Sequence, residues 1–195
     1  MTSTQQSPQD QQSTDFIDVL SAQHREVEGL FAELEARFGS KAEEVENTAR
    51  RAVTLLVEHT VAEEVHLYPL VREVLDDGDT IAEREIAEHD DAERTMKRLE
   101  ALPASSGDFW LTYRILTNLI AQHVGEEEQY LFPRLAEAVS KQDREQIGDR
   151  MLSTQKTAPT RPHPSSPSEG GQLAALAPGA GLVDRVRDAL TGRGR

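Results

Sequence analysis

Residues 59–69 read HTVAEEVHLYP, and residues 123–133 read HVGEEEQYLFP. Each stretch has a histidine, a glutamate four residues later and a proline ten residues after the histidine. Each also lies within a run of apolar residues that recur at helical spacing. Because a helix buries charged groups only where the protein interior satisfies them, the repeat predicts a shared polar site inside a helical core.

Apolar residues recur at steps of three and four over four long segments of the chain. We predict helices over about 15–38, 41–76, 80–101 and 107–139, with short joints between them. No run alternates between apolar and polar residues as a strand would. The pattern predicts an all-α fold, an antiparallel up-and-down four-helix bundle.

The repeat extends beyond the histidine and the glutamate. At an offset of 64 residues Glu63 matches Glu127 and Pro69 matches Pro133, and at an offset of 65 His24 matches His89. The chain therefore reads as two helical hairpins packed as a pseudo-twofold pair, with four histidines at similar depth.

The two ends of the chain differ in composition from this repeated part. Residues 1–13 are polar and rich in Gln and Ser, which predicts a disordered tail. We assign 14–152 to the bundle and 153–181, rich in Pro, Ser and Gly, to a flexible linker. Residues 182–195 form a basic tail whose spacing fits a short helix, which could contact a protein partner.

Composition excludes several classes of function. The chain has no cysteine, so disulfides, zinc–thiolate sites, iron–sulfur clusters and cysteine nucleophiles are excluded. The net charge is −14, and an acidic domain repels phosphate backbones, so we expect no binding to nucleic acid. No apolar run is long enough to span a membrane, and the N-terminus lacks a signal pattern. We expect a cytoplasmic protein that does not bind membranes.

The spacing of the repeat brings an imidazole and a carboxylate to one face of each helix, because residues i and i+4 lie one turn apart. A cation is the natural way to satisfy such a buried cluster, the alternative being a hydrogen-bonded polar layer without metal. An imidazole-rich set with two carboxylates and no thiolate suits iron, zinc, copper or manganese. Six ligands exceed the four of a lone zinc and suit two metals. The candidates are His24, His59, Glu63, His89, His123 and Glu127.

The order of these residues, H…HxxxE…H…HxxxE, together with the trailing LYP and LFP, resembles the hemerythrin-like HHE cation-binding domains over about residues 14–150. The resemblance implies a four-helix bundle with two non-haem iron ions, bridged by Glu63 and Glu127 and by an oxo or hydroxo group. It also implies that the six candidates are the ligands.

The resemblance departs from the oxygen-carrying hemerythrins at one position. Those proteins have a fifth histidine ligand four residues after the one on the third helix, where this chain has Glu93. His66 is a candidate fifth ligand or outer contact, with a partly exposed histidine at the edge of the helix face as the alternative. Tyr130, its partner in the repeat, is a candidate hydrogen-bond donor to a bound oxygen species, with a place in the core as the alternative. Glu93 is a weaker candidate, with a solvated helix face as the alternative. We interpret Glu64, Glu126 and Glu128 as surface charges.

Two functions remain open at this point. The first is a di-iron protein that binds or reacts with O2, H2O2 or NO, and if it is an enzyme it is catalase-like or an NO-related oxidoreductase. The second is a sensing or metal-binding module without turnover, in which the bundle responds to iron, oxygen or redox state and the tail reports it. No individual catalytic residue can be assigned from the sequence.

Overall fold

The computed structural model describes residues 14–163 together with Asp184 and Asp188. Over these residues the chain is helical and contains no strand, which confirms the all-α prediction. The tail expected over 1–13 lies outside the described residues, as do most of the linker and the basic tail. The helices are α1 (Phe16–Ala36), α2 (Ala42–Ala62), η1 (Glu63–Leu67), α3 (Tyr68–Val74), α4 (Gly78–Glu100), α5 (Gly107–Glu126), η2 (Glu127–Leu131), α6 (Phe132–Ala138) and α7 (Lys141–Gln155).

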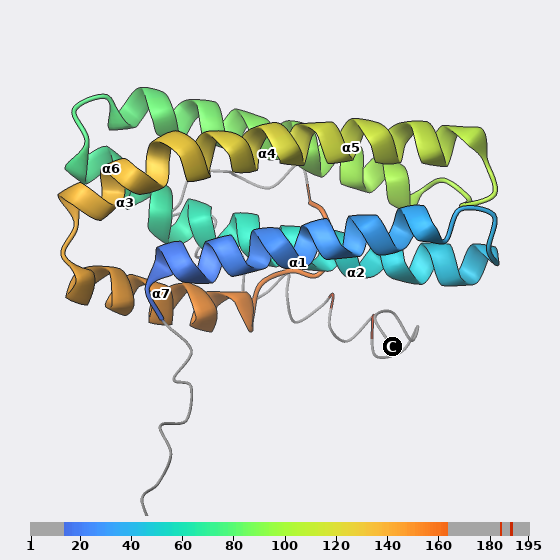
Figure 1. Cartoon of the computed structure of the whole chain (residues 1–195), viewed down its shortest axis with the longest axis horizontal. Helices are drawn as coiled ribbons and strands as arrows, with labels where there is room; N and C mark the ends of the chain where they lie inside the picture. Colours follow the sequence, from blue (N-terminus) through green and yellow to red (C-terminus); the bar gives the residue numbers. More distant parts are fainter. Residues whose placement is uncertain (1–13, 164–183, 185–187, 189–195) are drawn as a thin grey trace, which may run out of the picture.

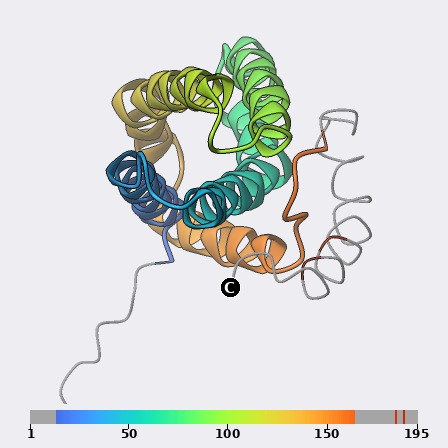
Figure 2. The same cartoon turned by 90° about the vertical axis from the view of Figure 1, so that its right-hand side faces the viewer.

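Four long helical rods lie side by side around a common interior (Figures 1 and 2). The first rod is α1, the second is α2 continued by η1 and α3, the third is α4, and the fourth is α5 continued by η2 and α6. The shorter helix α7 packs outside this group, against α1 and α2. It lies outside the four predicted helices and extends past residue 152, the predicted end of the bundle.

Side-chain caps fix the starts of three of these helices. The carboxylate of Asp15 accepts the backbone N–H of Ile17 at the start of α1 (3.1 Å). Ser106 caps α5 and Ser140 caps α7 in the same way, through hydroxyl groups that accept a backbone N–H. Each such cap satisfies an N–H that has no partner within its own helix.

Two π-helical turns interrupt the second and fourth rods directly after the HxxxE motifs. The N–H of Tyr68 donates to the carbonyl of Glu63, and the N–H of Phe132 donates to the carbonyl of Glu127, five residues back in each case. The next residue is a proline, whose ring clashes with the carbonyl four residues back in a regular helix. A wider turn relieves that clash, and π turns of this kind insert one extra residue into a helix.

The two rods therefore are not the uninterrupted helices expected over 41–76 and 107–139. Pro69 and Pro133 loosen the helix locally without breaking it. In each rod, the residues that face the interior after the π turn are shifted by one position along the sequence relative to the regular helical spacing before it.

The interior consists of two hydrophobic clusters with a polar layer between them. One cluster includes Val27, Leu56 and Leu116, and the other includes Leu20, Leu67 and Leu135. His24 lies between Leu20 and Val27 in the sequence, and so between the two clusters. The polar layer is thus shielded from water at both ends of the bundle axis.

Helix α7 docks closely enough to require a glycine. A Cβ atom at Gly148 would lie 1.8 Å from the carbonyl oxygen of Thr14, far inside van der Waals contact. Ile147 and Met151, on either side, are buried in the same hydrophobic cluster as Phe16. Helix α7 is therefore an integral part of the packed domain.

Residues 156–163, expected as the first part of a linker, pack against the domain after α7. Ala158 is fully buried, and the hydroxyl of Thr54 on α2 donates to the carbonyl of Thr160 (3.3 Å). Thr160 in turn donates its backbone N–H to Asp184, and Asp184 also contacts His163. The packed domain thus extends beyond residue 152.

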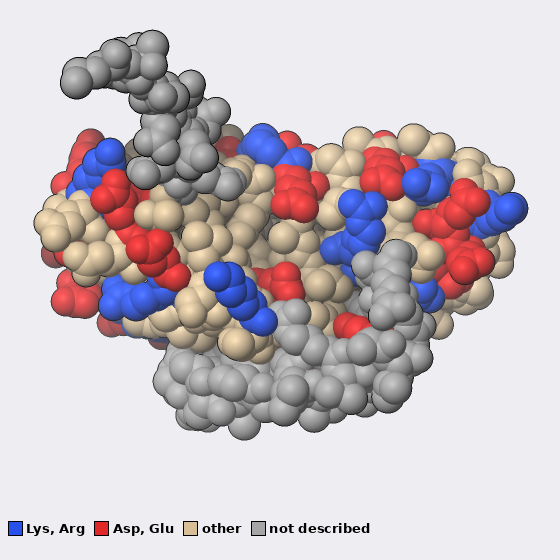
Figure 3. Space-filling view, turned by 90° about the horizontal axis from the view of Figure 1, so that it is seen from below, with Lys and Arg blue, Asp and Glu red and all other residues tan. Residues whose placement is uncertain are grey.

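The described surface is mixed in charge on the face seen from below, where acidic and basic side chains are interspersed and form no continuous basic patch (Figure 3). Among the described helices, none combines the length and the apolar character needed to cross a membrane.

Candidate metal centre

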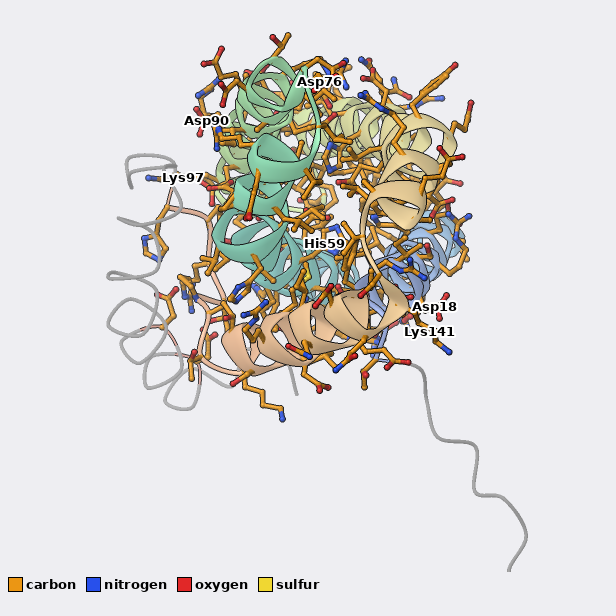
Figure 4. All side chains as sticks on the ribbon, turned by 90° about the vertical axis from the view of Figure 1, so that its left-hand side faces the viewer. Asp18, His59, Asp76, Asp90, Lys97 and Lys141 are labelled. Carbon is orange, nitrogen blue, oxygen red and sulfur yellow. The ribbon has the colours of Figure 1, made fainter. Side chains whose placement is uncertain are left out.

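The structure brings the six predicted side chains together at the middle of the bundle. His24 comes from α1 and His59 from the end of α2, while His89 comes from α4 and His123 from α5. Glu63 and Glu127 are the first residues of η1 and η2. All six are buried, with relative exposures of 5% or less, and Figure 4 shows His59 in the interior while Asp76 and Lys141 lie outside.

The four histidines form two pairs that face each other through their Nε2 atoms. The Nε2 atoms of His24 and His59 are 3.2 Å apart, and those of His89 and His123 are also 3.2 Å apart. Each pair combines one histidine of an HxxxE motif with one histidine from the neighbouring rod. Two equivalent half-sites result, as the sequence repeat predicts.

Each carboxylate extends from one histidine pair to the other. In Glu63, Oε1 lies 3.0 Å from Nε2 of His59 and Oε2 lies 3.4 Å from Nε2 of His89. The Oε2 atom of Glu127 lies 3.3 Å from Nε2 of His24 and 3.7 Å from Nε2 of His123. Both glutamates therefore stand where they could bridge two cations.

The other ring nitrogen of every histidine faces an acceptor oxygen outside the centre. Nδ1 of His24 donates to Glu128 (2.8 Å), and Nδ1 of His89 donates to Glu64 (3.0 Å). The remaining acceptors are Gln23 for His59 (2.9 Å) and Glu88 for His123 (3.3 Å). These contacts fix the tautomer, so that a neutral ring carries its proton on Nδ1 and directs its Nε2 lone pair inward.

The inward-facing atoms are therefore four nitrogen lone pairs and the oxygens of two carboxylates. No hydrogen bond reaches either oxygen of Glu63 or of Glu127, although all four oxygens are fully buried. Such an arrangement is repulsive unless cations occupy it, because buried acceptors without partners cost several kcal/mol. The donor set and its geometry fit bound metal ions, and groups within it could hold one.

Without metal, protons take the place of those cations. Burial alone lowers the pKa of a histidine, but the close carboxylates of Glu63 and Glu64 outweigh burial and raise the pKa of His89 to about 9. The pKa of His123 is raised in the same way, against burial, by Glu127 and by Glu85. Burial raises the pKa of Glu63, but the neighbouring His59 and His89 hold it well below its usual range.

Tyr68 lies against the centre, although it is not among the residues predicted from the sequence. Its hydroxyl is hydrogen-bonded to Nε2 of His89 at 3.0 Å, and the residue is fully buried. Burial and the charge of Glu63 raise the pKa of Tyr68 well above its usual value, so the phenol keeps its proton. The corresponding residue of the other half, Phe132, instead stacks on the ring of His24, with centroids 6.0 Å apart.

Two predicted additional residues lie away from the centre. His66 hydrogen-bonds through Nε2 to the hydroxyl of Thr154 on α7 (2.7 Å), and Tyr130 is 67% exposed. The prediction was wrong for both because it continued the regular helical period through the π turns. The extra residue in each turn rotates these side chains outward and brings Tyr68 and Phe132 inward.

Glu93, the third additional candidate, is half-buried on α4 and belongs to none of the candidate metal-binding groups. Burial, reinforced by the nearby Glu64, raises the pKa of Glu93 to about 7. It accepts the backbone N–H of His163 and so lies between the centre and the segment that follows α7.

The outer acceptors were the main omission of the sequence interpretation. Glu64 and Glu128, interpreted there as surface charges, each accept a hydrogen bond from a histidine of the centre. The sequence offered a signal for them, since each directly follows the glutamate of an HxxxE motif. Gln23 and Glu88 had no such signal, because they reach the histidines from another rod.

A small cavity adjoins the histidines on the side of the first hydrophobic cluster. Its volume is about 20 Å³, enough for roughly one water molecule. Thr60 also lines the cavity, and its hydroxyl donates to the carbonyl of Val57. The other lining residues, apart from the histidines and Glu88, are apolar: Val27, Leu56, Ala92, Leu119, Ile120 and Val124. Only very small molecules fit beside the centre.

A curated relative described as a DNA nickase, from Nostoc sp. (strain PCC 7120 / SAG 25.82 / UTEX 2576), is 28% identical over 137 residues. The match covers 70% of this chain but 38% of the relative, so the chain spans well under half of that protein. No solved structure matches the chain significantly. The hemerythrin HHE cation-binding domain matches residues 15–135, which contain all six residues of the centre. The chain is therefore a member of the hemerythrin HHE cation-binding domain family.

Proposed function

We propose that the protein is a hemerythrin-like di-iron protein that binds or reacts with small oxygen or nitrogen species, with H2O2, O2 and NO as the candidates. The observation that carries this proposal is the pair of facing imidazole sets with two buried carboxylates that extend between them. The four rods support an antiparallel four-helix bundle of the hemerythrin type as the scaffold.

Two ions fit the donor set better than one. His24 and His59 would hold one ion and His89 and His123 the other, with Glu63 and Glu127 shared between them. Imidazole and carboxylate donors without thiolate suit iron in preference to magnesium or calcium. Six side chains do not fill the coordination of two iron ions, so positions remain for a small ligand. A redox-active pair of ions supplies electron transfer to such a ligand.

The residues around the centre have roles of their own in this proposal. The apolar cavity excludes large and strongly hydrated molecules. With Nε2 of His89 occupied by a metal ion, the Tyr68 hydroxyl would lose its present hydrogen-bond partner and would be left facing the centre. The Tyr68 hydroxyl would then be a proton donor in a site that otherwise contains few proton donors. These features favour reactivity over iron storage.

Sensing without turnover is the second candidate function. It is favoured by the contact of α7 with the centre, because Gln155 forms a reciprocal amide pair with Gln23 (2.9 and 3.0 Å), the partner of His59. A change at His59 would reach α7 and the segment after it through this pair.

The nicking activity in the relative's description is not carried over, because the chain matches little of that protein. We propose no nucleic acid or membrane as a partner, and a protein partner for the tail remains a proposal.

Metal analysis with an absorption spectrum tests the proposal directly. Aerobically purified protein should contain two irons per chain with charge-transfer bands, and a His59→Ala, Glu127→Ala double variant should lose both. H2O2 decomposition and NO binding are then measured on the full chain and on a chain that ends after His163, where the continuous packed segment ends. Turnover that survives this truncation assigns the chemistry to the bundle. The absence of iron after iron-replete expression would refute the proposal.

A further inference from the structure

The two halves of the centre differ on their outer faces. At the repeat offsets, Glu85, Glu88 and Glu126 of the second half correspond to Leu20, Gln23 and Ala62 of the first. In the first half α7 covers this face, with Leu20 and Ala62 in one hydrophobic cluster and Gln23 paired with Gln155. No described helix covers the corresponding face of α4 and α5.

The uncovered face carries carboxylates at increasing depth. The side chains of Glu126 and Glu88 are 27% and 24% exposed, whereas Glu85 and Glu127 are fully buried. Ligand atoms of Glu85, His123 and Glu127 lie within 4.8 Å of one another. Carboxylates thus lie at successive depths, from Glu126 and Glu88 at the surface through Glu85 to Glu127. We call Glu85, Glu88 and Glu126 the acidic cluster.

One oxygen of Glu85 has an ion-pair partner but no hydrogen bond. This atom, Oε2, is buried. Nδ1 of His123 lies 2.9 Å away but directs its hydrogen bond to Glu88. A buried carboxylate oxygen without a hydrogen bond is costly, and a cation between Glu85 and its neighbours would satisfy it.

A cation already lies beside the acidic cluster. Nη2 of Arg84 is 2.7 Å from Oε1 of Glu85 and 3.1 Å from Oε2 of Glu126, and the Arg84 side chain is 52% exposed. A half-exposed guanidinium can swing into solvent without leaving a cavity. Arg84 therefore occupies the place that a metal ion would take and can vacate it.

The other outer sides of the centre are closed or less acidic. Gln23 lies under α7, and Glu64 is only 9% exposed. Glu128 is 30% exposed, and Arg25 holds it together with the exposed Glu28. Among the described residues, the side of His123 is the one where exposed carboxylates lead to a fully buried carboxylate, Glu85, that is not itself in an HxxxE motif but lies within reach of the centre.

We infer that the acidic cluster is a loading site that takes a hard divalent cation such as Fe²⁺ from solvent and passes it to the centre. The incoming cation would displace the Arg84 side chain from Glu85 and Glu126. The inference rests on the proposed metal centre and assigns residues that the centre itself does not use as ligands. Oxygen ligands alone hold such ions weakly enough for release, whereas the imidazoles behind them bind more tightly. Clustered carboxylates also raise the rate at which cations arrive.

The rate of metal uptake tests the inference separately from activity. Metal-free full-length protein is mixed with Co²⁺, whose visible absorption reports its binding by the imidazoles, and both rate and final content are measured. Glu126→Gln, which touches no histidine of the centre, and the Glu88→Gln, Glu126→Gln pair should load about 10-fold more slowly at low salt. The difference should shrink at high salt. Arg84→Gln should load faster.

A matched control is the Glu43→Gln, Glu137→Gln pair, which makes the same charge change at exposed positions outside the acidic cluster. It should load at the wild-type rate and to the same final content. Equal rates in the control and the Glu88→Gln, Glu126→Gln pair would overturn the loading site while leaving the metal centre intact. A lower final Co²⁺ content in Glu126→Gln would also overturn it, since the residue would then retain the ion. Failure of the wild type to take up any metal would instead refute the proposed centre.

Discussion

The metal-free protein should lose stability as the pH rises through the alkaline range. The close carboxylates of Glu63 and Glu64 raise the pKa of His89 to about 9 against the effect of burial, from an ordinary value of 6.5. A histidine whose pKa is raised on folding stabilises the protein fully below its unfolded pKa. That contribution is lost as the pH rises through its folded pKa. The window here lies between about pH 6.5 and pH 9.

The size of the effect follows from the same pKa values. A rise of this extent corresponds to about 3 kcal/mol for His89 alone. For a chain of this length, that loss lowers the melting temperature by roughly 6 to 12 °C. The pKa values of His24 and His123 are also raised, so their deprotonation acts in the same direction.

Thermal and urea unfolding of metal-free protein between pH 6 and pH 9.5 measure this loss. His89→Gln is the reference, because it removes the titrating group and should flatten the dependence over the same range. Metal-loaded protein should instead lose stability as the pH falls, because protons then compete with the ions for the imidazoles. Metal-free protein that is equally stable at pH 6.5 and pH 9.5 would refute the view that protonated histidines replace the cations.

Three further predictions concern single residues. Tyr68→Phe should keep its metal content but lower H2O2 turnover by on the order of 100-fold, as expected for loss of a proton donor, and unchanged turnover would exclude that role. His66→Ala should bind metal as the wild type does and lose about 1 kcal/mol of unfolding free energy with its bond to Thr154, whereas a loss of metal would restore His66 as a ligand. Gly148→Ala should lower the melting temperature by several degrees, since its Cβ would collide with the carbonyl of Thr14; an unchanged melting temperature would show that α7 can shift freely.

The sequence predicted the parts of the protein that depend on local spacing. His59 and Glu63 face the same way because they are four residues apart on one helix, and the repeat at residue 123 placed a second pair opposite. Order along the chain was enough to identify the helices and the six inward side chains. That these side chains bind metal is still a proposal.

The parts that the sequence did not predict depend on contacts between rods. Gln23 reaches His59 from α1, and Glu88 reaches His123 from α4, so neither has a fixed spacing from its partner. The docking of α7 was missed for the same reason. Its weakly amphipathic sequence acquires a buried face only where Met151 meets the hydrophobic cluster that contains Phe16 and Leu67.

The π turns have a consequence for any helical-wheel projection of this chain. Successive residues of a regular helix are rotated by about 100°, so one inserted residue changes the phase of everything that follows by that angle. The second rod has one phase up to Glu63 and another from Leu67 onward, and the fourth rod changes phase at the corresponding place. A single wheel drawn through either rod mixes the two phases and turns Tyr68 outward. Sequences with HxxxE followed five residues later by an aromatic residue and proline should be projected as two wheels, and the aromatic residue then falls on the side of the metal.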